Sequence, residues 1–125
     1  MSPSVLLVDD NEDLLECIGS FLKIGGFNVR TAQNGSQACI EYQNARPDLV
    51  IMDIVMEGMD GYDTFFQIKD ADPEAKVILM TGFQKKERFY EAEKRGLFGF
   101  IEKPFTGKQL LDYLSEKNVL PTASV

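Results

Sequence analysis

The sequence contains no histidine, and only two of its 125 residues are cysteine. The lack of histidine excludes catalysis by Ser-His-Asp or Cys-His groups, and it excludes zinc sites that use histidine. The chain cannot carry a phosphohistidine either. Cys17 and Cys39 stand in separate segments with helical patterning and form no CxxC motif. The sequence therefore indicates no disulfide framework and favours a reducing compartment.

Basic residues are scarce as well. Lys and Arg number 13 against 20 Asp and Glu, which gives a net charge of −7. An acidic chain repels phosphate backbones and anionic lipid headgroups, so binding to nucleic acid by this chain alone and binding to membranes are both disfavoured. No apolar run approaches the roughly 18 residues of a membrane span. The N-terminal Met-Ser-Pro-Ser lacks the basic start of a secretory signal, and we expect a cytoplasmic protein.

The size and composition fit one folded domain. A chain of 125 residues can bury a single sizeable core. Its hydrophobic share of 44% and charged share of 26% are ordinary for a soluble globular protein. No linker or low-complexity stretch divides the chain, so we expect a single domain over residues 1–125, with a loose tail at 118–125.

Five short apolar runs recur along the chain. They cover residues 5–8, 27–31, 49–52, 77–80 and 98–101. The first, third and fourth are continuously apolar, which is typical of strands buried on both faces in the middle of a parallel sheet. The second run alternates apolar with polar residues, and the fifth is interrupted by Gly99. These two runs are therefore expected at the edges of the sheet.

Segments with helical spacing separate the runs. They cover residues 11–24, 35–45, 61–71 and 85–95, and a capping box at Thr106–Gln109 opens a last helix. The strand and helix patterns alternate five times, with successive strands about 20 to 28 residues apart. This order requires right-handed crossovers, and it predicts an α/β fold in which helices cover both faces of a parallel sheet.

Chemically active residues follow four of the five runs. In open α/β sheets, ligands bind outside the carboxyl ends of the strands. The residues at these ends are Asp9, Asp10, Asp53, Thr81 and Lys103.

Each of these residues also has an ordinary structural explanation. Asp10 or Asn11 could cap the first helix, and Asp53 could be a loop carboxylate. Thr81 could belong to a turn, and Lys103 could be a solvated surface charge. All four explanations would have to hold at one edge of the sheet, so their combination favours a functional site.

The acidic residues point to a cation. Residues 9–16 hold five acids and no base, and Asp9 and Asp10 would lie close to Asp53 if the first and third strands were neighbours. Repulsion among such carboxylates either raises a pKa or recruits a divalent cation. An all-oxygen site suits Mg²⁺ or Mn²⁺, and these ions accompany phosphoryl chemistry.

Five short motifs occur in one order along the chain. They are Leu-Leu-Val-Asp9-Asp10, Leu-Val-Ile-Met-Asp53, Met-Asp60-Gly61, Ile-Leu-Met-Thr81-Gly82 and Gly-Phe-Ile-Glu-Lys103-Pro104-Phe105. With these motifs the chain resembles, over residues 4–117, the receiver domains of bacterial two-component response regulators of the chemotaxis-regulator type. The resemblance implies a flavodoxin-like (βα)5 fold, a three-layer αβα arrangement whose five parallel strands have the order 2-1-3-4-5.

The resemblance also implies roles for the acidic residues. Asp53 would be the phosphoacceptor. Asp10 and Asp53 would bind Mg²⁺ directly, together with the backbone carbonyl of Val55, and Asp9 would act through water.

Further roles follow from the same resemblance. Thr81 would hydrogen-bond the phosphoryl group, Lys103 would pair with it, and the Lys103–Pro104 peptide would be cis. Phe100 would be the switch aromatic, where the family commonly has Tyr. Glu57 stands where the family often has Pro, and this change predicts a more mobile loop after Asp53.

The implied activity is that of a signalling switch that catalyses its own phosphorylation and dephosphorylation. Because the chain has no histidine, the phosphodonor would be a separate histidine kinase or phosphotransfer protein. Val55 and Phe83 would border the path of the hydrolysing water, and neither can orient a water molecule. We therefore expect slow self-dephosphorylation.

The output surface would be the face of the fourth helix, the fifth strand and the fifth helix, with an unknown partner. Six aromatic residues and five basic residues cluster in this part of the sequence, and they indicate either core packing or a protein-binding face. They are Phe83, Phe89, Tyr90, Phe98, Phe100 and Phe105, with Lys85, Lys86, Arg88, Lys94 and Arg95.

Three other classes of protein fit the sequence less well than the switch. A haloacid-dehalogenase-like phosphatase would need an Asp-x-Asp motif after the first strand, and Asp9-Asp10-Asn11 does not match. A receiver-like binding module that is never phosphorylated is disfavoured by the intact set of acidic residues, Thr81 and Lys103. In a flavodoxin, the first loop would have to bind a phosphate, which its acidic residues would repel.

Overall fold

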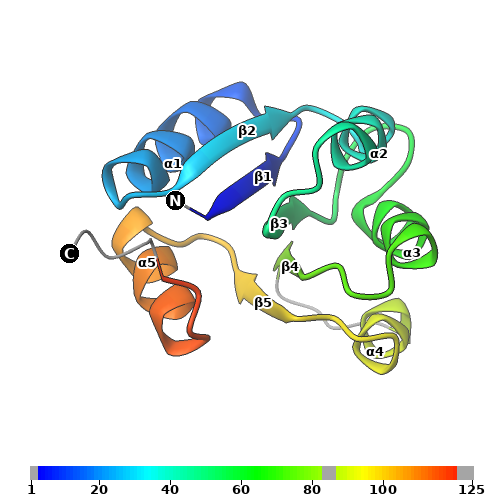
Figure 1. Ribbon diagram of the computed structural model, residues 1–125. Helices are drawn as coiled ribbons and strands as arrows, with labels where there is room; N and C mark the ends of the chain where they lie inside the picture. Colours follow the sequence, from blue (N-terminus) through cyan, green and yellow to red (C-terminus); the bar gives the residue numbers. More distant parts are fainter. Residues whose placement is uncertain (1–2, 83–86, 121–125) are drawn as a thin grey trace.

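The computed structural model describes residues 3–82 and 87–120, in which five strands alternate with five helices (Figure 1). The strands are β1 (Ser4–Val8), β2 (Asn28–Ala32), β3 (Leu49–Asp53), β4 (Val77–Thr81) and β5 (Gly99–Glu102). The helices are α1 (Glu12–Ile24), α2 (Gly35–Asn44), α3 (Gly61–Ala71), α4 (Glu87–Lys94) and α5 (Gly107–Glu116). All neighbouring strands are parallel, in the order β2-β1-β3-β4-β5. This confirms the expected sheet.

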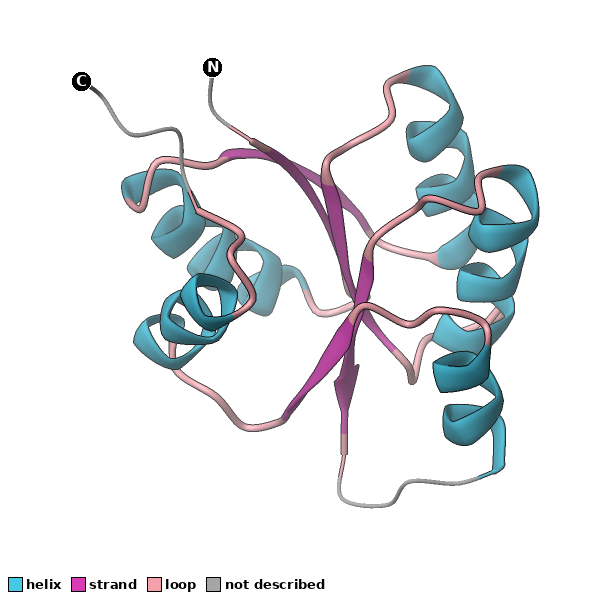
Figure 2. Cartoon of the chain, turned by 60° about the horizontal axis from the view of Figure 1, so that its bottom comes forward, coloured by secondary structure: helices cyan, strands magenta, loops and turns pink. Residues whose placement is uncertain are grey.

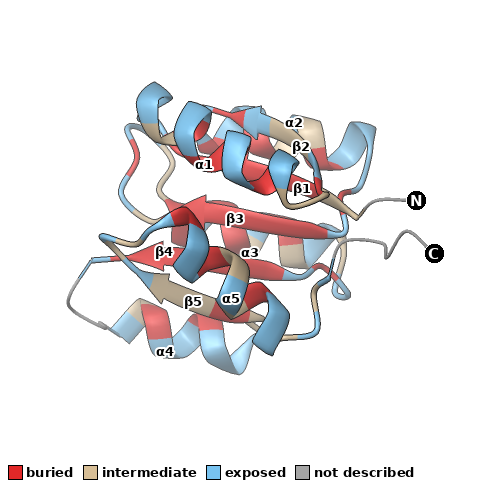
Figure 3. Cartoon of the chain, turned by 90° about the vertical axis from the view of Figure 1, so that its left-hand side faces the viewer, coloured by how far each residue is buried: buried red, intermediate tan, exposed pale blue. Residues whose placement is uncertain are grey.

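The three continuously apolar runs form the centre of the sheet, as expected. Every residue of β3 and β4 is buried, and so is β1 from Val5 onward. The edge strands β2 and β5 both contain exposed residues. Figure 3 shows this contrast between the buried central strands and the exposed outer surface of the helices. The apolar patterning of each run thus determines its place in the sheet, because central strands are covered on both faces.

Helices cover both faces of the sheet. In Figures 1 and 2, α1 and α5 lie on one side of the strands and α2, α3 and α4 on the other. Alternate strand residues point to opposite faces, so Leu6 and Val8 pack with α2, α3 and α4, whereas Val5 and Leu7 pack with α1 and α5. Two separate hydrophobic clusters result, one on each face of the sheet. Together they fix the positions of the strands, and so of the residues at the strand ends.

Side-chain caps begin the helices where the sequence suggested them. Asn11, and not Asp10, caps α1, because its side chain accepts a hydrogen bond from the Leu14 N–H at 3.2 Å. The capping box of α5 is complete, with Thr106 and Gln109 each accepting a hydrogen bond from the backbone N–H of the other. With Asn11 in the capping role, the carboxylate of Asp10 remains available at the edge of the sheet.

The described part of helix α4 covers Glu87–Lys94. Residues 85 and 86 of the expected helix lie outside the described residues, as does Phe83. Phe89 and Ala92 anchor the helix in the core, whereas Tyr90 is 52% exposed.

Four of the described aromatic residues of this region, Phe89, Phe98, Phe100 and Phe105, are divided between the two hydrophobic clusters. Phe89 is completely buried, and Phe100 packs edge-to-face against it with 5.0 Å between ring centroids. Phe98 and Phe105 pack instead against the cluster beneath α1 and α5. Core packing, one of the two expected interpretations, thus accounts for these described aromatics, and a protein-binding face over α4, β5 and α5 stays a prediction.

None of the helices in the described part of the chain has the length and apolar character that crossing a bilayer requires.

Candidate functional site

The sheet topology brings the expected site residues to one edge. Asp53 and Thr81 are the last residues of β3 and β4, and Asp9 and Lys103 directly follow β1 and β5. These four strands are parallel and adjacent, so their carboxyl ends meet. Asp10 follows Asp9 in the loop to α1 and is exposed.

Asp9 is the most enclosed member of the site, with 1% of its surface exposed. Its backbone N–H donates to the carbonyl of Ala32 at 3.1 Å, which links the end of β1 to β2. Its Oδ1 accepts a hydrogen bond from the Asn11 N–H at 2.9 Å, and its Oδ2 accepts one from the Lys103 ammonium at 3.0 Å. Both carboxylate oxygens therefore have partners, which compensates for the burial of the charge.

Lys103 bridges the two buried carboxylates. Its Nζ lies 3.0 Å from Asp9 Oδ2 and 3.2 Å from Asp53 Oδ1. Burial alone would lower the pKa of Lys103, but the two carboxylates outweigh it, so the pKa is raised and the ammonium stays charged. Its backbone N–H donates to the carbonyl of Thr81 at 2.8 Å, and its peptide bond to Pro104 is cis, as the resemblance implied.

Asp53 is a buried carboxylate, 7% exposed. Desolvation raises its pKa, and the nearby charge of Asp9 raises it further. The Lys103 ammonium and a hydrogen bond from the Val55 backbone oppose this shift without cancelling it. In the folded protein the ionised form of Asp53 is therefore held at a cost in stability.

This cost predicts a pH-dependent effect of Asp53→Asn. A carboxyl group whose pKa is raised on folding contributes stability below its unfolded pKa and loses it as pH rises through the folded pKa. Without divalent cations, Asp53→Asn should therefore melt at a higher temperature than wild type at pH 7, and the difference should vanish below about pH 4. Thermal unfolding followed by circular dichroism across this range measures the difference.

Asp112→Asn is the matched control for this prediction. Asp112 is an exposed carboxylate of α5 that pairs with Lys108 at 3.0 Å. Its replacement should not stabilise the protein at any pH. A melting temperature of Asp53→Asn at or below that of wild type at pH 7 would contradict the prediction.

Three carboxylates could hold a metal ion. One oxygen from each of Asp9, Asp10 and Asp53 lies within 4.8 Å of the others. The donors are all oxygens, and the absence of histidine from the chain removes the usual nitrogen ligand of zinc. This donor set fits Mg²⁺ or Mn²⁺.

Three further residues, Thr81, Val55 and Phe83, were expected at or near the site. Thr81, the last residue of β4, is buried with 4% of its surface exposed. The Val55 side chain is 77% exposed and points away from the core, and the ligand role of its carbonyl stays a prediction. Phe83, which was expected to border the path of the hydrolysing water, lies outside the described part of the chain.

One structural determinant of the site was seen in the sequence only as part of a motif. Gly61 donates its N–H to the carbonyl of Ile54 at 2.8 Å, and this bond closes the loop over residues 54–60. A Cβ on Gly61 would collide with the carbonyl oxygen of Asp53. Asp60 thus caps α3, and Gly61 fixes the loop that follows Asp53 through its hydrogen bond to Ile54.

Comparison with known proteins agrees with this architecture. Residues 5–115 match the family model described as the response regulator receiver domain. The chemotaxis protein CheY of Halobacterium salinarum is 36% identical over 116 residues, which cover 93% of this chain and 97% of that protein.

Proteins called NtrX are similar as well. The nitrogen assimilation regulatory protein NtrX of Azorhizobium caulinodans is 34% identical over 89% of this chain, which spans only 25% of that protein. The crystal structure of the receiver domain of NtrX from Brucella abortus matches with a TM-score of 0.81 and 31% identity, covering 90% of this chain and 96% of that one. With the 2-1-3-4-5 sheet, these matches show that the chain belongs to the response regulator receiver domain family of two-component signalling.

Proposed function

We propose that Asp53 accepts a phosphoryl group from a histidine kinase or phosphotransfer protein, and that this modification switches a protein-interaction surface formed by α4, β5 and α5. The chain would act as one receiver domain with its core over residues 4–117. One observation carries the proposal: Asp53 ends the central strand β3 beside Asp9, with the Lys103 ammonium 3.2 Å from its Oδ1. A buried, cation-paired carboxylate at this edge has the position and chemistry of a nucleophile.

The reaction follows from the residues at this edge. An oxygen of Asp53 forms a bond to phosphorus as the bond from phosphorus to the donor breaks, and the donor leaves with the electron pair. The product is an aspartyl phosphate. Lys103 favours the ionised form of Asp53 and neutralises charge on the transferring oxygens. A bound Mg²⁺ ion, held by Asp10 and Asp53, the Val55 carbonyl and Asp9 through water, would supply further charge neutralisation.

The switch would begin at Thr81. Its hydroxyl would donate a hydrogen bond to the phosphoryl group, and the movement would free space for Phe100. The Phe100 N–H donates to the Tyr113 hydroxyl at 3.0 Å, and the Phe100 ring packs against Phe89. Phe100 therefore contacts both α5 and α4. A change in its position would alter the packing of both helices on the proposed output face.

The stoichiometry of phosphate uptake tests the function. In acetyl phosphate and Mg²⁺, a receiver should gain one phosphoryl group per chain, detected by intact-mass spectrometry. A phosphatase would instead release many phosphates per chain, and a binding module would gain none. Self-dephosphorylation of the adduct is expected to be slow.

The proposed metal site predicts that Mg²⁺ changes the thermal stability of the protein. Mg²⁺ should raise the melting temperature of the unphosphorylated protein, because it relieves repulsion among Asp9, Asp10 and Asp53. At a hundredfold excess over Kd the stabilisation is about 2.7 kcal/mol for one site. Asp10→Asn should remove most of the response without disturbing the fold, since Asp10 is exposed. Differential scanning calorimetry with and without Mg²⁺ measures it, and an Asp10→Asn variant with the full response would rule out this ligand set.

A further inference from the structure

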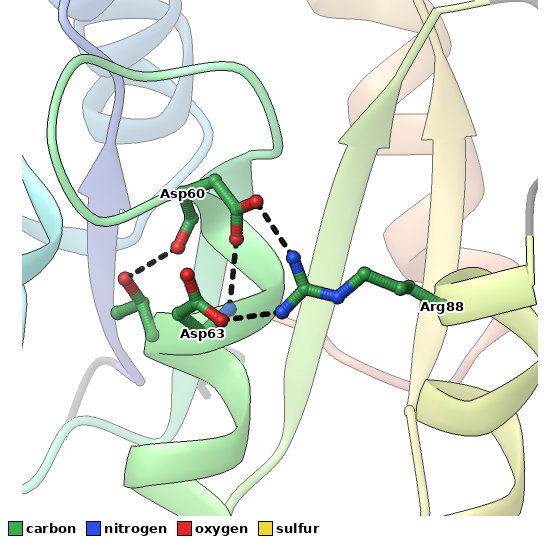
Figure 4. Close-up of polar contacts among 4 residues, drawn as sticks. Asp60, Asp63 and Arg88 are labelled. Atoms are coloured by element: carbon green, nitrogen blue, oxygen red, sulfur yellow. Dashed lines mark hydrogen bonds and ion pairs between the residues drawn. The ribbon is translucent and has the colours of Figure 1, made fainter.

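Two arginines tie α4 to α3. Arg88, in the first turn of α4, donates from Nη1 to Asp60 Oδ2 at 2.8 Å and from Nη2 to Asp63 Oδ1 (Figure 4). Its guanidinium also lies over the Tyr62 ring, 5.2 Å from the ring centroid. It also lies 6.0 Å from the centroid of the Phe66 ring, so Arg88 binds α3 with two charge-assisted hydrogen bonds and two cation–π contacts.

Arg95 makes the comparable contact at the other end of α4. It pairs with Asp70 and lies over the Phe66 ring, 5.2 Å from the centroid. The side chains of Arg88 and Arg95 are both 40% exposed. The two arginines therefore form a matched pair of contacts between α4 and α3, at opposite ends of α4.

Only the Arg88 contact reaches the loop that follows Asp53. Asp60, its partner, caps α3 by accepting the Asp63 N–H at 2.9 Å on Oδ1, and its carbonyl accepts the Thr64 hydroxyl at 2.8 Å (Figure 4). Asp60 is the last residue of the loop that the Gly61 N–H closes onto Ile54. The partner of Arg95 lies ten residues further along the chain, near the opposite end of α3.

We propose that Arg88 is a positioning residue that couples this acceptor loop to α4, and that it favours the position of α4 in the unphosphorylated state. The inference rests on the proposed function. Thr81 precedes Glu87, the first described residue of α4, by only six positions in the sequence. Arg88 holds the first described turn of α4 against Asp60 and Asp63, so these contacts resist a displacement of that turn when Thr81 moves toward a phosphoryl group.

Coupling of this kind is reciprocal. Contacts that favour the unphosphorylated arrangement lower the affinity for a phosphoryl group, and their removal raises it. The contacts of Arg88 are partly exposed, with 34% of the Asp60 side chain and 52% of the Asp63 side chain accessible. Partly exposed ion pairs contribute little, so we expect removal of Arg88 to tighten binding of a phosphoryl analogue about fivefold, which corresponds to about 1 kcal/mol.

The experiment compares matched variants of the full chain. Calorimetric titration with beryllofluoride, a tetrahedral analogue of the phosphoryl group, in saturating Mg²⁺ yields the Kd of wild type, Arg88→Met and Arg95→Met. Both variants should lose a similar, small amount of thermal stability. Only Arg88→Met should bind about fivefold more tightly, and at 0.5 M NaCl its difference from wild type should shrink because salt screens exposed pairs.

The outcomes separate the coupling from the proposed function. An Arg88→Met variant with the wild-type Kd or a weaker one would overturn the coupling, as would an equal tightening in Arg95→Met. Arg88→Lys, which keeps the charge but cannot form the forked contact, should fall between wild type and Arg88→Met. A wild-type chain that binds no beryllofluoride would overturn the proposed function itself.

Discussion

Replacing Asp53 with asparagine is expected to leave the chain unable to take up a phosphoryl group from acetyl phosphate. The amide has nearly the shape of the carboxylate but no anionic oxygen to attack phosphorus. Intact-mass spectra of wild type in Mg²⁺ should show one added phosphoryl group, and spectra of Asp53→Asn should show none. Thermal unfolding of Asp53→Asn at pH 7 without divalent cations, where the substitution is expected to stabilise the protein, shows that loss of uptake does not reflect unfolding.

Two other aspartates, one beside Asp53 and one remote from it, supply controls for this experiment. Asp10→Asn keeps the acceptor but lacks an expected Mg²⁺ ligand, so its uptake should be slower and not absent. Asp112→Asn, remote on α5, should match wild type. Uptake by Asp53→Asn at the wild-type rate would show that another residue is the acceptor.

Gly61→Ala is expected to destabilise the fold by about 3 kcal/mol or more, at the upper end of the cost of overpacking. Gly61 is the first residue of α3, where an alanine backbone would be acceptable. The cost arises from space, because the added Cβ would meet the Asp53 carbonyl oxygen and lie 2.7 Å from the Ile54 Cα. These are backbone atoms at the end of β3, and they cannot move without displacing Asp53. Urea denaturation should therefore show a lower midpoint.

Gly19→Ala is expected to have the opposite effect on stability and serves as the control for Gly61→Ala. Gly19 lies inside α1, and a Cβ there would meet only Val29 Cγ1, at an ordinary distance of 3.9 Å. Alanine should therefore stabilise the helix by about 0.5 to 1 kcal/mol. A higher midpoint for Gly19→Ala together with a lower one for Gly61→Ala is the expected pair. Equal midpoints would show that the space around Gly61 does not limit the side chain there.

Local patterning in the sequence predicted which strands are central and which lie at the edges, and it predicted the capping box of α5. The apolar runs of β1, β3 and β4 predicted central strands because a strand covered on both faces needs apolar side chains at every position. The capping box of α5 was readable because its hydrogen bonds span only three residues. The site was predicted in the same way, since any residue at the end of a parallel strand must lie at the carboxyl edge.

Contacts between distant segments were decided by the tertiary structure alone. No spacing rule joins Arg88 to Asp60, which is 28 residues earlier, because packing of α4 beside α3 sets that distance. Packing also explains the interruption at Gly99, where a Cβ would collide with the Tyr113 hydroxyl that accepts the Phe100 N–H.

The aromatic residues near β5 show the same division between sequence and structure. Phe98 and Phe100 are two residues apart, and strand alternation would put them on the same face. Phe98 precedes β5, however, so alternation does not apply to it and the two rings pack on opposite sides of the sheet. The sequence by itself determined which strands are buried on both faces and which residues follow each strand, because both can be read from the local pattern of apolar residues. The tertiary structure decided which helix each side chain meets, because that depends on how whole elements pack.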